Sequence, residues 1–208
     1  MPDYEPMLAT RWPAAFDHPD WGFEIKWDGY RAIVSAEKGK VRARSRRGLD
    51  LIGPFPELTG IPIPDGVVVD GEIVAFDENG RPSFSRLQQR TGFGGRSTGA
   101  GVGVNLVVFD LLYADEPMVG RPYEERRGRL EALHLSSPIV VPEATPGSGI
   151  SLYTAARTQG LEGIVGKRLG SVYLPGRRSP DWRKISVRHR LRAVVGGYLP
   201  AEGGRTRS

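Results

Sequence analysis

The sequence predicts an α+β fold in which antiparallel sheets are flanked by helices. Many short segments are rich in β-branched and aromatic residues and are separated by turn residues, which is typical of strands. Few segments have the spacing of apolar residues that is typical of an amphipathic helix. With 208 residues, of which 39% are hydrophobic, the chain can bury the core of one large domain.

Two long apolar segments, residues 66–77 and 104–115, are predicted to be central strands of the core. Residues 78–82, with the sequence Glu-Asn-Gly-Arg-Pro, are typical of a turn after the first of them. The other predicted strands are shorter, and they are residues 22–29, 30–37, 40–45, 161–170 and 181–187. Together these segments are expected to form the sheets.

Three segments are predicted to be helices, at residues 83–90, 123–134 and 148–160. In the second, Leu130 and Leu133 have helical spacing amid charged residues, so this helix is amphipathic. Gly160 stands where a helix commonly ends. The glycine-rich residues 92–103 are predicted to be a loop, and not a phosphate cradle, because they lack the lysine and the following helix of a P-loop.

The composition excludes several classes of protein. The chain has no cysteine, so disulfides, a zinc ribbon and a thiol nucleophile are excluded, and its 3 histidines are too scattered for a histidine metal site. No apolar run approaches the roughly 18–20 residues that span a bilayer. The N-terminal segment lacks the apolar core of a signal peptide. We therefore expect a soluble, cytoplasmic protein that does not contact a membrane.

The chain is basic, with a formal net charge of +5 and a pI near 9.7. In a strand, Arg42, Arg44 and Arg46 would share one face, because side chains alternate along a strand. From the charge alone, an ordinary solvated basic surface is the better explanation. A polyanionic partner such as DNA is the alternative, and only a motif can decide for it.

The segment around Lys26 is the most informative. In an extended chain, Glu24, Lys26 and Asp28 would point the same way, and a lysine between two acids is commonly an ion-paired surface residue. However, several other apolar strands also contain charged residues, which is costly unless the charges are paired. These residues are Asp70, Glu72, Glu162, Lys167 and Lys184. The pattern favours one polar site that the sheets line together.

These residue types suit nucleophilic attack on a nucleotide α-phosphate. A lysine is a nucleophile only as the neutral amine, and its ordinary pKa is about 10.4. Cations such as Lys167, Lys184 and Arg46 would favour the neutral form. Carboxylates at Asp28, Glu72 and Glu162 would suit Mg²⁺, which prefers oxygen ligands and bridges phosphates.

Six segments in order resemble the motifs of covalent nucleotidyltransferases, the class of ATP-dependent DNA ligases, RNA ligases and mRNA capping enzymes. They are residues 26–31, which fit the pattern KxDGxR, and residues 45–48, 70–72, 109–113, 162–167 and 182–184. One KxDG pattern would be weak, but six ordered matches are specific. The resemblance runs from about residue 6 to about residue 197, and it is strongest to bacterial ATP-dependent DNA ligases of the end-joining type. It implies an ATP-grasp-like nucleotidyltransferase fold.

The resemblance implies a role for each matching residue. Lys26 would attack ATP and carry AMP as a covalent lysyl adduct. The residues implied in nucleotide binding are Glu24 and Ile25 near adenine, Phe109 stacked on it, Arg31, Arg46 and Glu72 near the ribose and phosphate, and Lys167 and Lys184 at the α-phosphate. Those implied in binding Mg²⁺ or Mn²⁺ are Asp28, Glu72 and Glu162, and those in binding DNA are Arg42, Arg44 and Arg47. Phe109 could instead be an ordinary core residue.

The resemblance also implies partners. Nicked or broken double-stranded DNA is the expected substrate, the expected process is end joining together with end-joining proteins, and the expected state is a monomer in the bacterial cytosol or nucleoid. An RNA ligase or a capping-type enzyme is the alternative within the class. A nucleic-acid-binding module that has lost catalysis is the alternative outside it.

The sequence departs from the family pattern at two places. The fifth motif usually has a second lysine where this chain has Ser186, so one contact to the phosphates is expected to be missing. Ligases of this family also continue into an OB-fold, which is largely absent here. We therefore predict a nucleotidyltransferase domain at residues 1–190 and a linker with the start of an OB-fold at 191–208. Weak self-adenylation and poor nick sealing are the expected consequences.

Overall fold

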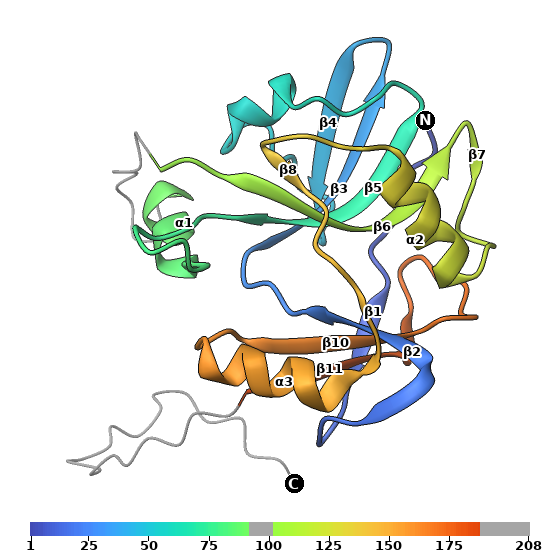
Figure 1. Cartoon of the computed structure of the whole chain (residues 1–208). Coiled ribbons are helices and arrows are strands. Elements are labelled where there is room, and N and C mark those ends of the chain that lie inside the picture. Colours follow the sequence, from blue (N-terminus) through green and yellow to red (C-terminus); the bar gives the residue numbers. More distant parts are fainter. Residues whose placement is uncertain (92–101, 188–208) are drawn as a thin grey trace, which may run out of the picture.

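A computed structural model describes residues 1–91 and 102–187 of the chain (Figure 1). Within these residues the fold consists of two sheets that face each other, with the helices on their outer sides. The predicted boundary between residues 190 and 191 lies outside the described residues, as does most of the glycine-rich segment 92–103.

The first sheet, sheet A, is five-stranded and contains both ends of the described chain. Its strand order is β1-β11-β10-β2-β9, and the strands are β1 (Leu8–Arg11), β2 (Asp17–Ile25), β9 (Thr145–Ser148), β10 (Gly163–Arg168) and β11 (Arg178–Ser186). All pairs are antiparallel except β1 with β11, which run parallel. The N-terminal segment is therefore a structural edge of this sheet.

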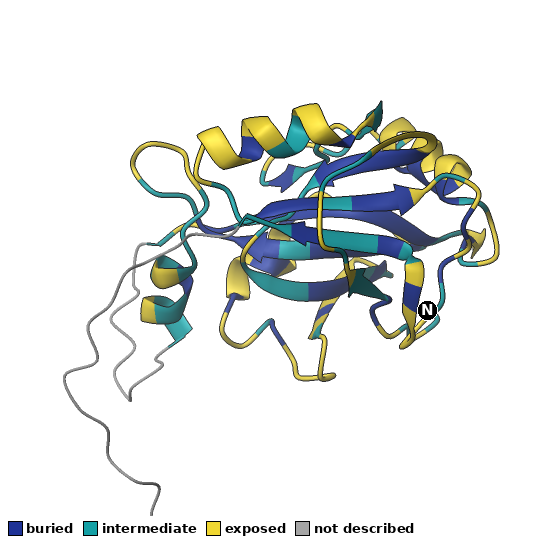
Figure 2. Ribbon diagram, turned by 90° about the horizontal axis from the view of Figure 1, so that it is seen from below, coloured by how far each residue is buried: buried dark blue, intermediate teal, exposed yellow. Residues whose placement is uncertain are grey.

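The second sheet, sheet B, is built around the two long apolar strands that the sequence predicts as central. Its strand order is β4-β3-β5-β6-β7, with β8 paired to β6, and the strands are β3 (Tyr30–Glu37), β4 (Lys40–Ser45), β5 (Val67–Val74), β6 (Asn105–Ala114), β7 (Glu116–Pro117) and β8 (Ile139–Val140). The β6–β8 pair is parallel. The main strands are mostly buried (Figure 2).

The helices close the outer faces of the sheets. They are the 3₁₀ helix η1 (Pro56–Gly60) and the α-helices α1 (Phe84–Thr91), α2 (Tyr123–Ala132) and α3 (Gly149–Thr158). The α2 helix packs beside β6, and α3 packs on β2 and β10. One hydrophobic core therefore lies behind each sheet, with Ala156 of α3 in the core of sheet A and Leu130 of α2 in the core of sheet B.

A third hydrophobic cluster joins the two sheets. It contains Ile33 and Phe109 from sheet B together with Trp182 from sheet A, and all three are buried. Because this cluster ties the sheets together, polar side chains next to it are held at fixed positions in the space between them.

The structure confirms the predicted α+β class. It adds five short elements that the sequence did not predict, η1, β1, β7, β8 and β9, and it differs from the prediction in two further details. The sheets are mixed, since each contains one parallel pair. The strand predicted at residues 22–29 begins at Asp17 and ends at Ile25. The prediction was wrong at its end because the chain leaves sheet A after Lys26 and crosses to sheet B, where β3 begins at Tyr30. Strand alternation therefore does not extend to Asp28.

The helices of the described part of the chain are all too short or too polar to cross a membrane.

Candidate active site

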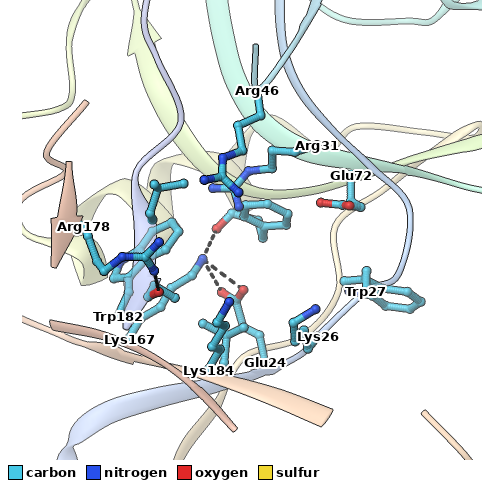
Figure 3. Close-up of a pocket in the computed structure, with 14 residues that line it drawn as sticks. Glu24, Lys26, Trp27, Arg31, Arg46, Glu72, Lys167, Arg178, Trp182 and Lys184 are labelled. Carbon is cyan, nitrogen blue, oxygen red and sulfur yellow. Dashed lines mark hydrogen bonds and ion pairs between the residues drawn. The ribbon is translucent and has the colours of Figure 1, made fainter. Parts of the chain in front are cut away.

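A pocket of about 220 Å³ lies between the two sheets, beside the cluster that joins them (Figure 3). Sheet B contributes Arg31, Glu72 and Phe109, and Arg46 follows its strand β4. The other lining residues are Leu8, Ala9, Glu24, Lys26, Trp27, Val165, Lys167, Arg178, Trp182 and Lys184. Charged residues that lie far apart in the sequence therefore share one cavity, as the sequence pattern predicts.

The register of sheet A explains why its charged residues face this pocket together. Glu24 of β2 lies opposite Val165 of β10, and Val165 lies opposite Lys184 of β11. Residues that are opposite each other in a sheet point to the same face. Lys167 and Trp182 form the next such pair on that face. Strand alternation along three strands thus produces one polar surface.

Lys26 lies at the entrance of the pocket, directly after β2. Its backbone N–H donates to the carbonyl of Gly163 at 2.9 Å, and its Nζ forms an ion pair with the Glu162 carboxylate. The backbone of Gly163 has a φ of 143°, and a Cβ there would lie 2.1 Å from the carbonyl oxygen of Ile185. Only glycine fits this position, so the Glu162-Gly163 pair is placed beside Lys26 by backbone geometry.

Gly29 allows the loop after Lys26 to pass close to sheet B. A Cβ at Gly29 would lie 2.1 Å from the carbonyl oxygen of Ile73 and 3.1 Å from Cγ of Glu72. The glycine of the KxDG pattern therefore has a physical reason here. It lets Lys26, which follows β2 of sheet A, and Glu72 of sheet B line the same pocket.

A buried ion pair forms the inner end of the pocket. Nζ of Lys167 lies 2.9 Å from Oε2 of Glu24, and it also donates to the carbonyl oxygen of Phe109 at 2.7 Å. Burial lowers the pKa of Lys167, and the negative charges of Glu24 and Asp110 oppose that shift. Lys167 thus connects the two sheets through charge and a hydrogen bond (Figure 3).

Two residues of α2 hold Glu24 from behind, and sequence reasoning missed both. The hydroxyl of Tyr123 donates to the Glu24 carboxylate, and Nη1 of Arg127 lies 3.6 Å from it. Burial and the neighbouring Glu24 raise the pKa of Tyr123 well above its usual value, so the phenol stays protonated. The only signal in the sequence was a tyrosine and an arginine on the apolar side of a predicted helix, which does not identify a partner.

A second buried group fixes Arg31. Its guanidinium donates to both oxygens of Asp70, at 2.5 and 2.6 Å, and the Tyr173 hydroxyl donates to the same carboxylate at 2.5 Å. Its Cζ lies 4.7 Å from the centre of the Phe109 ring. Asp70 therefore orients Arg31 and does not face the pocket itself, while Phe109 presents part of an aromatic ring to the cavity.

The electrostatics of the pocket differ between its carboxylates and its amines. Burial raises the pKa of Glu72 to about 7, although the positive charges of Arg31 and Lys26 oppose the shift. Burial also lowers the pKa of Lys184, and the nearby charges of Lys26 and Arg178 lower it further. An anionic ligand or a bound cation would shift the pKa values of both Glu72 and Lys184, as expected for a binding site.

A metal site is not preformed among the described residues, since no group of three metal-binding side chains occurs there. Glu72 lines the pocket, Glu162 borders it beside Lys26, and Asp28 is exposed and does not line the pocket. Protein-bound Mg²⁺ commonly uses only one or two carboxylates together with substrate phosphates. The donor set of Glu72 and Glu162 fits such a shared site.

The remaining predicted residues are divided. The side chain of Ile25 packs in the core on the other face of sheet A, so only its backbone is available to a nucleotide. Arg42 and Arg44 are exposed on β4, where Arg44 pairs with Asp3, and Arg47 is exposed in the following turn. Apart from Ile25, the residues predicted to bind the nucleotide thus line one pocket, and the three arginines predicted to bind DNA lie outside it.

The fold and the site together define a covalent nucleotidyltransferase. A lysine amine lies at the entrance of a pocket lined by an aromatic ring, buried carboxylates and several cations. These groups suit the binding of a nucleoside triphosphate.

Comparison with known proteins identifies the family. Residues 6–186 match the model of the ATP-dependent DNA ligase domain, and the chain belongs to this family and is a ligase catalytic domain. It is 41% identical over 206 residues to the multifunctional non-homologous end joining protein LigD of Mycobacterium bovis. The aligned region covers 97% of this chain and 26% of that protein. It is 31% identical to the DNA ligase-like protein LigB of Bacillus subtilis, over 93% of this chain and 71% of the relative.

Solved structures agree. The ligase domain of Mycobacterium tuberculosis LigD superposes with a TM-score of 0.76 at 38% identity, covering 88% of this chain and 60% of that chain. A mycobacterial DNA ligase D complexed with ATP superposes with a TM-score of 0.75. The chain thus spans about a quarter of the length of the LigD proteins it matches.

Proposed function

We propose that the chain transfers AMP from ATP to a DNA 5′-phosphate through Lys26, in the joining of broken double-stranded DNA. The observation that carries the proposal is the position of Lys26, which lines the pocket and whose Nζ, among the described residues, is paired only with the partly exposed carboxylate of Glu162. An amine in this position can change partners without breaking a buried ion pair.

In the proposed first step, the Lys26 ammonium loses one proton, which the contacting Glu162 carboxylate is positioned to accept. The amine then attacks the α-phosphorus of ATP, a P–N bond forms, and the bond to the β-phosphate breaks with release of pyrophosphate. Lys184 and Arg46 line the pocket and would balance charge on the phosphates. Glu24 and Phe109 lie at the inner end, where adenine would bind.

In the next steps, a DNA 5′-phosphate oxygen attacks the phosphorus of the adduct and the P–N bond breaks, which returns the lysine amine. A DNA 3′-hydroxyl then attacks the 5′-phosphate and releases AMP. Glu72 and, once it has released the proton of Lys26 to solvent, Glu162 are the carboxylates that would hold Mg²⁺ or Mn²⁺, and not the exposed Asp28. When bound, the ion neutralises phosphate charge.

Two unpaired donors support a nucleotide as the ligand. The indole N–H groups of Trp27 and Trp182 are buried and have no acceptor in the described part of the chain, although both residues line the pocket. Buried donors without a partner are costly, and ligand or water oxygens are what can satisfy them.

The DNA and partner assignments extend this proposal. Arg42, Arg44 and Arg47 are exposed at one end of sheet B and would contact DNA phosphates, with binding that weakens as salt rises. End joining, and end-joining proteins as partners, are inferred from the similarity to LigD, which is named a non-homologous end joining protein. We further propose that the domain acts as a monomer in the bacterial cytosol.

Intact-mass spectrometry after incubation with ATP and Mg²⁺ tests the central step. We expect a mass increase of one AMP, absent in Lys26→Ala and retained in Lys40→Ala, a control at an exposed lysine of β4. Labelling by GTP alone would indicate a capping-type enzyme. If no adduct forms at any ATP concentration, the domain is a binding module and the proposal is wrong.

A further inference from the structure

A second cavity adjoins the nucleotide pocket at the side of Lys26. Its lining residues are Arg11, Lys26, Glu162, Arg178, Lys184 and Ser186. Lys26, Arg178 and Lys184 also line the nucleotide pocket, so the two cavities are continuous. Four of the six residues are cations, and the only carboxylate among them, Glu162, is already paired with Lys26. The cavity therefore has an excess of positive charge.

Arg11 reaches this cavity because β1 runs parallel to β11. Arg11 lies opposite Lys184 in the register, and the next residue, Trp12, donates its backbone N–H to the carbonyl of Lys184 at 3.0 Å. Arg178 of β11 donates to the carbonyl of Ala9 on β1. Backbone pairing therefore places Arg11 beside Lys184, while Arg178, whose backbone lies opposite Leu8, lines the same cavity with its side chain.

Ser186 lies on the same face as these cations. It follows Lys184 by two residues within β11, and alternate residues of a strand point to the same side. The resemblance in the sequence implies a second lysine at this position, and the serine present provides no charge. Arg11, on the neighbouring strand, places a guanidinium beside the position that the lysine would occupy.

The chemistry of the cavity fits the terminal phosphates of a triphosphate. In an ATP bound with its α-phosphate at Lys26 and its base at the inner end, the other two phosphates extend away from Glu24. A guanidinium can donate two parallel hydrogen bonds to phosphate oxygens, and such charge-assisted bonds are the strong ones. Arg11 and Arg178 lie on this side of Lys26.

We propose that Arg11, together with Arg178, binds the β- and γ-phosphates of ATP and the pyrophosphate that leaves, and so replaces the cation missing at Ser186. The inference rests on the proposed adenylation at Lys26 and adds a subsite to it. The ligand is a pyrophosphate group, and a phosphate of DNA is the other source of the same chemistry.

The test compares ATP with AMP. In Arg11→Ala, calorimetry should show about tenfold weaker binding of ATP and of inorganic pyrophosphate, with unchanged binding of AMP. Discharge of preformed lysyl-AMP by pyrophosphate should slow, while transfer of AMP from the same adduct to 5′-phosphorylated DNA should not. Arg177→Ala removes an exposed arginine that lines neither cavity, and it should change none of these values.

A second variant tests the replacement of charge. Adding Ser186→Lys to Arg11→Ala should restore most of the lost affinity for ATP, and equal melting temperatures would establish that all variants fold. Unchanged ATP and pyrophosphate binding in Arg11→Ala would overturn the inference, and slower AMP transfer to DNA in the same variant would assign the cavity to DNA. ATP binding is measured without turnover, so it does not depend on formation of the adduct. A wild-type chain that forms no adduct would therefore overturn the proposed function, while the effect of Arg11→Ala on ATP binding would still test the inference.

Discussion

The inner and outer ends of the pocket contain the same pair of residue types, a lysine and a glutamate, in different surroundings. At the inner end, the side chains of Lys167 and Glu24 are 1% and 3% exposed, and at the outer end those of Lys26 and Glu162 are 22% and 36% exposed. A buried pair is costly to separate, whereas a partly exposed pair exchanges its partners with water and ligands at little cost. The inner pair is therefore suited to fixed recognition, and the outer pair to chemistry.

The surroundings of each pair agree with this division. Inside the protein, the Glu24 carboxylate also accepts a hydrogen bond from Tyr123 and forms an ion pair with Arg127. At the outer end, Lys184 and Arg11 bring positive charge that the carboxylate of Glu162, already paired with Lys26, balances only in part. Lys26, the proposed nucleophile, lies in the part of the site that would accept ATP, release pyrophosphate and admit DNA, so a rigid buried network there would hinder each proposed step.

The largest effect is expected from removing the inner cation. Lys167→Met leaves the buried Glu24 with fewer partners, so the free energy of unfolding should fall by about 3–5 kcal/mol, and adenylation should be lost. Urea denaturation measures the first effect and intact mass the second. In Lys40→Met, a change at an exposed lysine, the unfolding free energy should stay within about 0.5 kcal/mol of the wild type. A Lys167→Met chain as stable as the wild type would contradict the role of the buried pair.

A smaller effect is expected from Tyr123→Phe, which removes one hydrogen bond to Glu24 without removing its ion pairs. The unfolding free energy should fall by about 1–3 kcal/mol, because a buried acceptor loses a donor. AMP and ATP should both bind more weakly, by similar factors, since the change lies at the adenine end. If ATP affinity fell while AMP affinity did not, Tyr123 would act on the phosphates and the division between the two ends would be wrong.

The smallest effect on stability is expected at the outer pair. Glu162→Gln should change the unfolding free energy by less than about 1 kcal/mol, because both partners are partly exposed. Formation of lysyl-AMP should nevertheless slow at least tenfold, since the residue that contacts Nζ loses its charge and its capacity to accept a proton. Stopped reactions followed by intact mass would measure the rate. A loss of stability as large as that of Lys167→Met would show that the two ends do not differ.

Much of the site could be predicted from the sequence because its residues follow strand alternation. Lys167 and Lys184 stand inside apolar strands, and a charged residue in such a strand must face a polar site or a partner. The same logic failed at Asp28, because the strand ends at Ile25 and the side chains no longer alternate in one sheet. A pattern of residues gives faces only while the backbone stays regular.

By itself, the sequence determined the class of fold, the two central strands, Lys26 as the proposed nucleophile and most of the charged residues around it, since these depend on local periodicity and on residue chemistry. Only the tertiary structure decided which charges meet. The parallel pairing of β1 with β11 brings Arg11 next to Lys184, and the packing of α2 places Tyr123 behind Glu24. Such contacts join residues far apart in the chain, as in the case of Arg11 and Ser186, so no local pattern can encode them.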